Sequence, residues 1–271
     1  MRSRPPGRAG ASSRSPGRPA RPRPRPSNKL EKEFRAQGLQ RVAGVDEVGR
    51  GCLFGPVVAA AVILDPQRPV SGLDDSKRLA PGMRRRLSER IRERAIAVSL
   101  AAADSARIDR WNILQATRQA MLEAVKGLSP APDALLVDAI TIALDMPQLA
   151  VIRGDALSLA IAAASIIAKV ERDQWMEQWD RLYPGYGLAS NKGYGTAAHL
   201  EALRRRGPTP LHRFSFRPVA EAAQFPPTPF PAILLPPALG APPASGAPPL
   251  FPETAASPAA PAGASSKGAL S

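Results

Sequence analysis

Short apolar runs alternate with polar, glycine-rich or helically periodic segments from residue 42 onward. Runs of four to eight apolar residues with many β-branched side chains are typical of buried strands. The link at residues 49–56 is too rich in glycine for a helix, so we expect two strands joined by a tight connection there. The pattern predicts strands at residues 42–45, 57–64, 96–103, 134–137 and 150–152.

Other segments repeat their apolar residues at helical spacing. In residues 81–95, Arg and Glu alternate around Leu87 and Ile91, and Pro81 stands at the first helical position. The first half of residues 156–183 is apolar on every side and small, which indicates a helix buried close against a sheet. Further helices are expected at residues 108–128 and 196–206. The order of elements favours an α/β fold with a mixed central β-sheet flanked by helices and a small C-terminal helical part.

Proline, with 31 residues in all, gathers toward both ends of the 271-residue chain. These end segments carry too little apolar surface to offset the entropy of ordering. We therefore expect a disordered basic Arg/Pro-rich tail at residues 1–35, one folded domain at residues 36–222 and a disordered Pro/Ala-rich tail at residues 223–271.

The formal net charge of +14 is concentrated at the N-terminus. Residues 1–30 hold eight arginines and Lys29 without any acid, which accounts for +9 of it. Such an arm favours polyanions such as nucleic acid through counterion release. A purely solubilising arm has the same composition, so the charge alone does not decide between the two.

Cys52 is the single cysteine, which excludes an intrachain disulfide and is compatible with a reducing cytoplasm. No run of about 18 apolar residues predicts a membrane span, and the N-terminus lacks the apolar stretch of a secretory signal. We expect a cytoplasmic protein, a monomer that does not contact membranes.

Four acidic residues stand at the edges of apolar elements. Asp46 and Glu47 follow the first strand, Asp138 follows the strand at 134–137, and Asp155 opens the buried helix. Strand ends are where sites assemble in α/β sheets, and gathered carboxylates need a cation to offset their repulsion. Hard oxygen ligands suit Mg²⁺ or Mn²⁺. Any one of these acids taken alone is better explained as a cap or turn residue, but the set predicts a divalent-metal site.

Carboxylates holding two such ions can hydrolyse a phosphodiester, because one ion activates water and the other stabilises the leaving oxygen. A zinc site is not indicated, since the chain has only His199 and His212 and no Cys–His ligand spacing.

A set of motifs in a fixed order closely resembles the ribonuclease HII family, the type 2 ribonucleases H. The likeness extends over nearly all of residues 42–218. The segments that carry it are residues 45–51 (VDEVGRG), 55–58 (GPVV), 75–79 (DSKRL), 112–117 (NILQAT), 137–138, 154–155, 162–173 (AAASIIAKVERD), 192–196 (KGYGT) with His199, and His212-Arg213.

This resemblance implies an RNase H-like fold and an endonuclease that produces 5′-phosphomonoesters. It implies hydrolysis of the RNA strand of RNA–DNA hybrids and incision 5′ to single ribonucleotides embedded in duplex DNA by two-metal-ion catalysis, in support of ribonucleotide removal in DNA replication and repair. By position, Asp46, Glu47, Asp138 and Asp155 match the family's catalytic metal ligands. Its substrate-binding residues are matched by Gly49, Arg50, Gly51, Lys77 and Tyr194, of which the glycine–arginine–glycine turn reads the 2′-hydroxyl.

The chemistry of these substrate positions is consistent with that role. Glycines let a backbone approach a sugar closely, and the 2′-hydroxyl is the group that separates RNA from DNA. An aromatic ring such as that of Tyr194 can stack on a base or sugar. Ordinary packing for Tyr194 and a solvated loop for Lys77 are the simpler alternatives. Ala139, where the family commonly has glycine, and residues 188–191 depart from the family pattern.

Two other functions remain open at this level. A catalytically silent nucleic-acid-binding protein could keep the fold and the basic arm, although the four acids are intact. A DNA resolvase of the same fold would cut all-DNA duplexes equally well. The Pro-rich C-terminal segment is a candidate contact for a sliding clamp, although it contains no clear binding motif.

Overall fold

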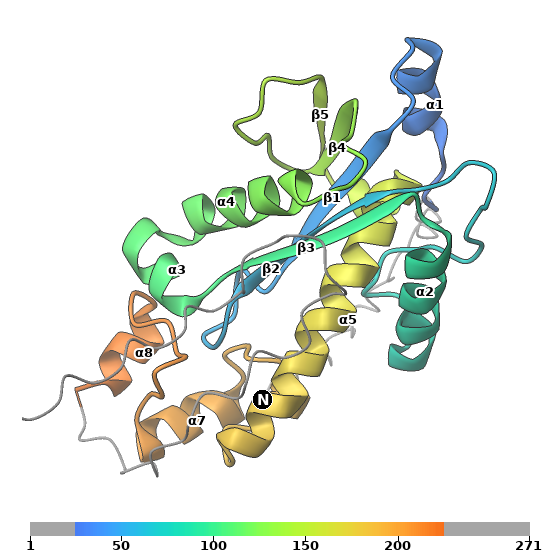
Figure 1. Cartoon of the computed structure of the whole chain (residues 1–271). Coiled ribbons are helices and arrows are strands. Elements are labelled where there is room, and N and C mark those ends of the chain that lie inside the picture. The colour runs from blue at the N-terminus through green and yellow to red at the C-terminus, as the bar shows by residue number, and fades with distance from the viewer. Residues whose placement is uncertain (1–24, 225–271) are drawn as a thin grey trace, which may run out of the picture.

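The computed structural model describes residues 25–224, which form a sheet covered by helices on both faces (Figure 1). Most of the predicted basic tail and nearly all of the predicted Pro/Ala tail lie outside these residues, so the predicted domain limits stay predictions. Within the described part of the chain, no helix is long and apolar enough to cross a membrane.

The sheet is mixed, as predicted. Its five strands follow the order β3-β2-β1-β4-β5. The two pairs that β2 forms, with β1 and with β3, are antiparallel, whereas the two pairs that β4 forms, with β1 and with β5, are parallel. The strands are β1 (Val42–Val48), β2 (Val57–Ile63), β3 (Ala97–Ala103), β4 (Ala134–Asp138) and β5 (Gln148–Val151).

The central strand β1 is longer than the apolar run that predicted it. The run ends at Val45, but strand pairing with β2 continues through Asp46 and Glu47 to Val48. The two acids therefore lie within the strand and not after it, because pairing with β2 extends the strand past the last apolar side chain of that run. They are thus held by the ladder of the sheet.

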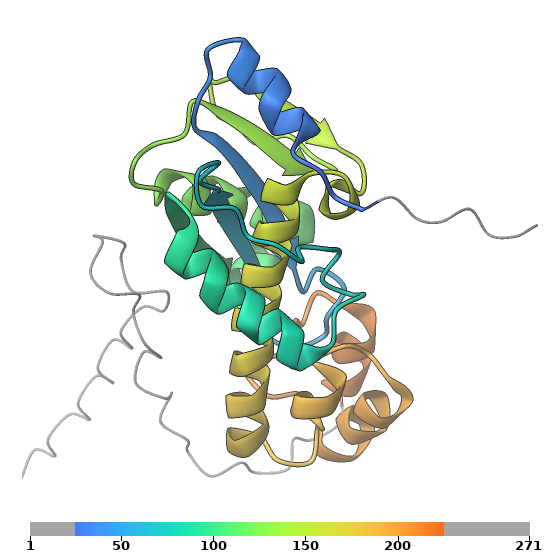
Figure 2. The same cartoon turned by 90° about the vertical axis from the view of Figure 1, so that its right-hand side faces the viewer.

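The longest helix, α5 (Leu159–Leu182), crosses one face of the sheet, with α2 (Pro81–Arg94) beside it (Figure 2). Gly44 of β1 makes this approach possible. A Cβ on Gly44 would lie 2.0 Å from the carbonyl carbon of Ala160 in α5, so only a glycine fits at this crossing. The small residues of the helix therefore pack against the sheet, as the sequence predicted.

The opposite face is covered by α3 (Ser105–Trp111) and α4 (Ile113–Lys126) (Figure 1). The sequence predicted one helix over residues 108–128, and this was wrong. Asn112 has φ of 71° between the two helices, and its side chain accepts hydrogen bonds from the amides of Leu114 and Gln115. This Asn cap starts a new helix where the apolar periodicity alone does not show a break.

The predicted buried helix begins three residues later than expected. Gly154–Ala156 forms a separate 3₁₀ turn, η1, and Ser158 then caps α5 by accepting a hydrogen bond from the Ile161 amide. Asp155 is therefore in the turn that precedes the helix and does not open it.

Part of the predicted N-terminal tail is folded. Residues Lys29–Ala36 form α1, although the sequence predicted disorder up to residue 35. The reason is one carboxylate: Glu31 is buried, and its Oε1 accepts hydrogen bonds from Ser158 Oγ at 2.7 Å and from the Ala160 amide at 2.8 Å. This anion at the N-terminus of α5 ties α1 to the domain.

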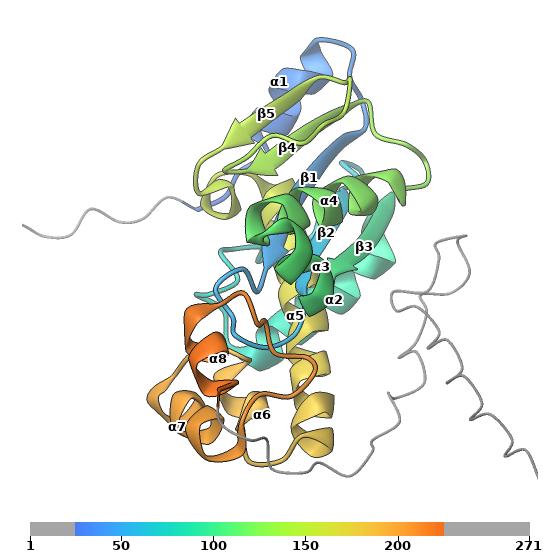
Figure 3. The same cartoon turned by 90° about the vertical axis from the view of Figure 1, so that its left-hand side faces the viewer.

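A small helical part follows α5 and lies beside the C-terminal end of that helix (Figure 3). It confirms the predicted C-terminal helical part, including a helix close to the predicted residues 196–206. Its helices are α6 (Leu188–Asn191), α7 (Ala197–Arg206) and α8 (Arg217–Ala222).

Candidate active site

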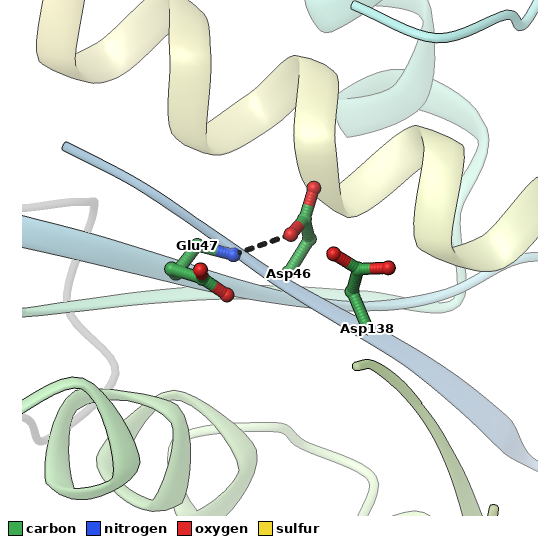
Figure 4. A group of neighbouring side chains, drawn as sticks. All are labelled: Asp46, Glu47 and Asp138. Carbon is green, nitrogen blue, oxygen red and sulfur yellow. Dashed lines mark hydrogen bonds between the residues drawn. The ribbon is translucent and has the colours of Figure 1, made fainter. Parts of the chain in front are cut away.

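Three carboxylates meet at the end of two neighbouring parallel strands. β1 pairs with β4 so that Val45 faces Val137, which brings the next residues, Asp46 and Asp138, side by side. One oxygen each from Asp46, Glu47 and Asp138 lies within 4.8 Å of the others (Figure 4). The fold thus brings together residues that are about ninety positions apart in the sequence.

Asp155 lies beside this group but is not part of it. The Gly154 amide donates to Asp138 Oδ1 at 2.7 Å, which places the turn containing Asp155 next to Asp138. The Asp155 carboxylate is buried and forms an ion pair with Lys77, with 3.2 Å between Oδ2 and Nζ. Of the four predicted ligands, the structure brings three into one cluster and pairs the fourth with a cation at its edge.

Burial and mutual repulsion make the acidic cluster costly without a counter-ion. Burial raises the pKa of Asp46 well above its usual value, and repulsion from Glu47 and Asp138 adds to this. The pKa values of Glu47 and Asp138 are also raised, first of all by burial. Carboxylates in this state favour either protons or a bound cation. The donor set, oxygen only, fits a hard divalent ion.

A pocket of about 410 Å³ opens above the cluster and contains all five predicted substrate-binding residues. Gly49, Arg50, Gly51, Lys77 and Tyr194 line it together with the three clustered acids. Its remaining lining residues are Val48, Ser76, Ser165 and Lys169, which the sequence did not single out, although all four lie in the motif segments 45–51, 75–79 and 162–173.

Two of these residues act on the acids directly. The Ser165 side chain hydrogen-bonds to Asp46 and lowers its pKa, against the effect of burial. Arg50 reaches Glu47 with 3.5 Å between Nη1 and Oε1. The ring of Tyr194 is 42% exposed, so it is available for stacking at the pocket rim.

Comparison with known proteins agrees with this geometry. The family model described as Ribonuclease HII matches residues 43–219. The ribonuclease HII of Solibacter usitatus (strain Ellin6076) is 58% identical over 197 residues, which cover 73% of this chain and 86% of that protein. This chain belongs to the ribonuclease HII family. It is accordingly a ribonuclease H, a hydrolase.

Solved structures of the family share the fold. The ribonuclease H2 of Pyrococcus horikoshii OT3 is similar with a TM-score of 0.59 and 25% identity, over 68% of this chain and 97% of that one. A structure of the PCNA:RNase HII complex from Archaeoglobus fulgidus is similar with a TM-score of 0.57 and 26% identity, over 68% and 98% of the two chains. The predicted RNase H-like fold is confirmed.

The two histidines of this ribonuclease HII family member lie apart from the acids. His199 and His212 are fully buried, and their Nε2 atoms lie 3.1 Å apart. Burial, followed by the neighbouring His199, lowers the pKa of His212 to about 3. They connect α7 to the loop that follows it and take no part in the acidic cluster.

The remaining candidates also have structural partners. Asp173 pairs with Lys169 and Arg84, and Cys52 is buried with its thiol 3.5 Å from the Lys192 carbonyl. Sequence reasoning missed Arg172 and Arg213 as site components. Both side chains are fully buried against the glycine-rich link at residues 49–56. Both lie in the motif segments, but nothing in the sequence shows that they meet.

Proposed function

We propose that this ribonuclease H hydrolyses the RNA strand of RNA–DNA hybrids and incises duplex DNA on the 5′ side of single embedded ribonucleotides, with two divalent ions. The observation that carries the proposal is the pocket that combines Asp46, Glu47 and Asp138 with the Gly49–Arg50–Gly51 turn. One side of the pocket suits a metal-bound phosphate, and the other suits a sugar.

The proposed ligands of the ions are Asp46, Glu47, Asp138 and Asp155. Bound Mg²⁺ or Mn²⁺ would supply an activated water and stabilise the leaving oxygen. The protein contributes the fixed positions: the sheet holds Asp46 and Asp138, and Ser165 orients Asp46. Asp155 is pre-oriented by Lys77 at 3.2 Å, and it would become a ligand when that lysine turns to a substrate phosphate.

Sugar recognition is assigned to the glycine turn. Gly51 has open space around it, because the nearest atom to a Cβ there would be a Tyr194 ring carbon at 3.9 Å. A ribose 2′-hydroxyl can therefore come close to the backbone of the turn, with Tyr194 stacking beside it. Lys77, whose side chain is 78% exposed, is placed to contact a phosphate.

The test is product mapping on a labelled duplex containing one ribonucleotide. The wild-type enzyme with Mn²⁺ or Mg²⁺ is expected to cut once, 5′ to the ribonucleotide, and to leave a matched all-DNA duplex intact. Asp138→Asn should abolish the cut. Equal cleavage of the all-DNA duplex would point instead to a resolvase-type nuclease, and tight binding without cleavage under either metal would point to a silent binding protein.

Action in DNA replication and repair is a further part of the proposal, with the cytoplasm as location and a monomer as the acting form. The complex of PCNA with the Archaeoglobus fulgidus enzyme supports contact with a sliding clamp. The candidate segment for this contact is the Pro-rich C-terminal tail, nearly all of which lies outside the described residues. Co-elution of the full chain, but not of residues 25–224, with a clamp would test it.

A further inference from the structure

Two buried arginines hold the glycine-rich link without any acidic partner. Arg172 of α5 and Arg213, which follows α7, are both fully buried. Among the described residues, neither forms an ion pair with a carboxylate. Within the described part of the chain, the hydrogen bonds of their guanidinium groups go to backbone carbonyls instead.

The accepting carbonyls belong almost entirely to one segment. Arg213 donates to Gly49 O at 2.7 Å, to Arg50 O at 2.8 Å and to Gly55 O at 2.9 Å. Arg172 donates to Phe54 O at 3.0 Å and to Pro56 O at 3.1 Å. Five carbonyls of the link at residues 49–56 are thus bound by two side chains.

The sixth carbonyl connects the link to the tyrosine of the pocket. Arg172 Nη1 donates to Lys192 O at 2.7 Å, two residues before Tyr194. The Leu53 amide donates to Gly193 O at 2.8 Å, and Cys52 pairs with Tyr194 in an isolated bridge. The same guanidinium therefore holds both the glycine turn and the segment that carries the aromatic ring.

Binding the carbonyls of the turn leaves its amides available. Within the described part of the chain, the N–H groups of Arg50 and Gly51 donate to no protein acceptor. Both residues line the pocket, where a sugar hydroxyl or phosphate oxygen could accept from them. Gly49 packs directly against the arginine: its φ is 95° and a Cβ there would lie 2.3 Å from Arg172 Nε, so only a glycine fits at this position.

Burying two arginine side chains has a high desolvation cost for a contact that would only hold the fold together. Two like charges are buried close together, and burial followed by the neighbouring Arg172 lowers the pKa of Arg213 to about 9. Apolar side chains could fill the same space without the cost of desolvating two cations. Apolar side chains could not orient the carbonyl groups of the link, because only hydrogen-bond donors in a rigid fork specify the orientation of a peptide group.

We propose that Arg172 and Arg213 are positioning residues for ribonucleotide recognition, which orient the backbone of the Gly49–Arg50–Gly51 turn and the adjacent Tyr194 so that the turn's amides face the 2′-hydroxyl. The inference rests on the proposed function, since it names how that site obtains its selectivity. Neither arginine lines the pocket, and among the described residues neither forms a hydrogen bond or ion pair with the four acids.

The test uses Arg172→Lys and Arg213→Lys in the full chain. Lysine keeps the charge and the length but loses the planar fork that holds several carbonyls at once. Met121→Ala is the control, because Met121 is buried on the opposite face of the sheet, away from the link, and its truncation lowers stability without touching the turn. Each variant is checked for folding and for Mn²⁺ binding by calorimetry.

The deciding readout is discrimination of the 2′-hydroxyl. The affinity of each variant is measured for two duplexes, one with a single ribonucleotide and one of the same sequence that is all DNA. Ca²⁺ is the divalent ion in this binding measurement, which does not depend on turnover. Both Lys variants are expected to bind Mn²⁺ like wild type, to lose most of the difference between the two duplexes, and to lower kcat at the ribonucleotide by about 10-fold or more. Met121→Ala should keep the wild-type difference.

Wild-type discrimination and kcat in both folded Lys variants would overturn the inference. If Arg172→Lys does not fold, Arg213→Lys carries the same measurement from a loop instead of a helix. If the wild-type enzyme itself does not distinguish the two duplexes, the proposed function fails, and this outcome is separate from failure of the arginine variants.

Discussion

Lys77 Nζ lies 3.2 Å from Asp155 Oδ2, so a cationic side chain already pairs with a carboxylate that is proposed to bind a metal ion. The lysine side chain is 78% exposed, whereas that of the aspartate is 9% exposed, which makes the pair easy to open from the lysine side. The ion pair holds the acid at the edge of the cluster, and under the proposed function it would open when substrate and metal bind.

Lys77→Met should therefore separate metal binding from substrate binding. Removing a positive charge near the acids should strengthen Mn²⁺ binding to the free protein by roughly 2- to 5-fold, a small effect because the pair is partly exposed. The KM for a ribonucleotide-containing duplex should rise in the same variant. Calorimetry and steady-state kinetics measure the two. A weaker Mn²⁺ affinity would contradict the idea that Lys77 competes with the ion.

Asp46→Asn is expected to remove activity while stabilising the metal-free protein. Loss of this proposed ligand should lower kcat by roughly 100-fold or more, since mutation of a residue that only hydrogen-bonds to a metal ligand already lowers activity by about 10- to 100-fold. The pKa of Asp46 is raised in the folded state, so folding favours its neutral form. An amide keeps the shape without the charge. Turnover at the wild-type rate would refute the assignment of this acid.

The same shift fixes the pH dependence of stability. Because the pKa values of Asp46, Glu47 and Asp138 are raised on folding, the cluster costs nothing below the unfolded carboxyl pKa of about 4 and destabilises the metal-free protein increasingly as pH rises through the folded values. Urea unfolding in EDTA should show Asp46→Asn more stable than wild type at pH 7 and equal to it near pH 4. Saturating Mn²⁺ should reverse the order at pH 7.

Gly44→Ala should be among the most damaging single-methyl additions in this chain. The new Cβ would lie 2.0 Å from the backbone of α5 at Ala160, and neither strand nor helix can yield cheaply. We expect a loss of about 3 kcal/mol or more in the free energy of unfolding. Gly82→Ala in α2 is the control: a Cβ there meets nothing within 4 Å, so it should be neutral or stabilising by roughly 0.5 kcal/mol.

Glu31→Ala should weaken the domain but not the chemistry. It removes two hydrogen bonds at the start of α5 and leaves the Ser158 hydroxyl and the Ala160 amide without their acceptor. The expected cost is about 1–3 kcal/mol in the free energy of unfolding. Single-turnover cleavage at saturating substrate should be unchanged at temperatures where the variant is folded. An unchanged unfolding midpoint would show that α1 is not held by this carboxylate.

Deletion of residues 1–24 tests the basic arm without touching α1. The segment carries seven arginines and no acid, so its loss should make binding to duplexes less dependent on salt and leave the single-turnover rate intact. A deletion up to residue 35, which the sequence alone suggests, would also remove Glu31 and mix the two effects. A large loss of single-turnover rate in the shorter deletion would contradict the prediction.

The parts of the fold that follow from local pattern were predictable. Apolar runs located β2 and β4, and the small residues of α5 indicated a helix close to the sheet. The break at Asn112 and the folding of α1 were not predictable in this way. Each depends on one polar side chain that finds its acceptors or donors only in the folded chain.

The candidate site likewise has residues that could be predicted from the sequence and residues that could not. Its acids could be found from strand ends and motif order, and three of them meet as expected. The carbonyl partners of Arg172 and Arg213 could not be found, because a charged residue that binds backbone groups leaves no complementary side chain in the sequence. The pairing of Asp155 with Lys77 was missed for another reason, since either residue suggests a role of its own.

One helix sets the spacing of the whole active centre. Ser165, which bonds to Asp46, and Arg172, which grips the link, are seven positions apart on α5, so they share a face and stand about 10 Å apart along the axis. α5 thus sets the distance between the acidic cluster and the glycine turn that we propose recognises the sugar. A single residue inserted between Ser165 and Arg172 would turn one end by about 100° relative to the other, and the proposed incision should then lose its register with the ribonucleotide.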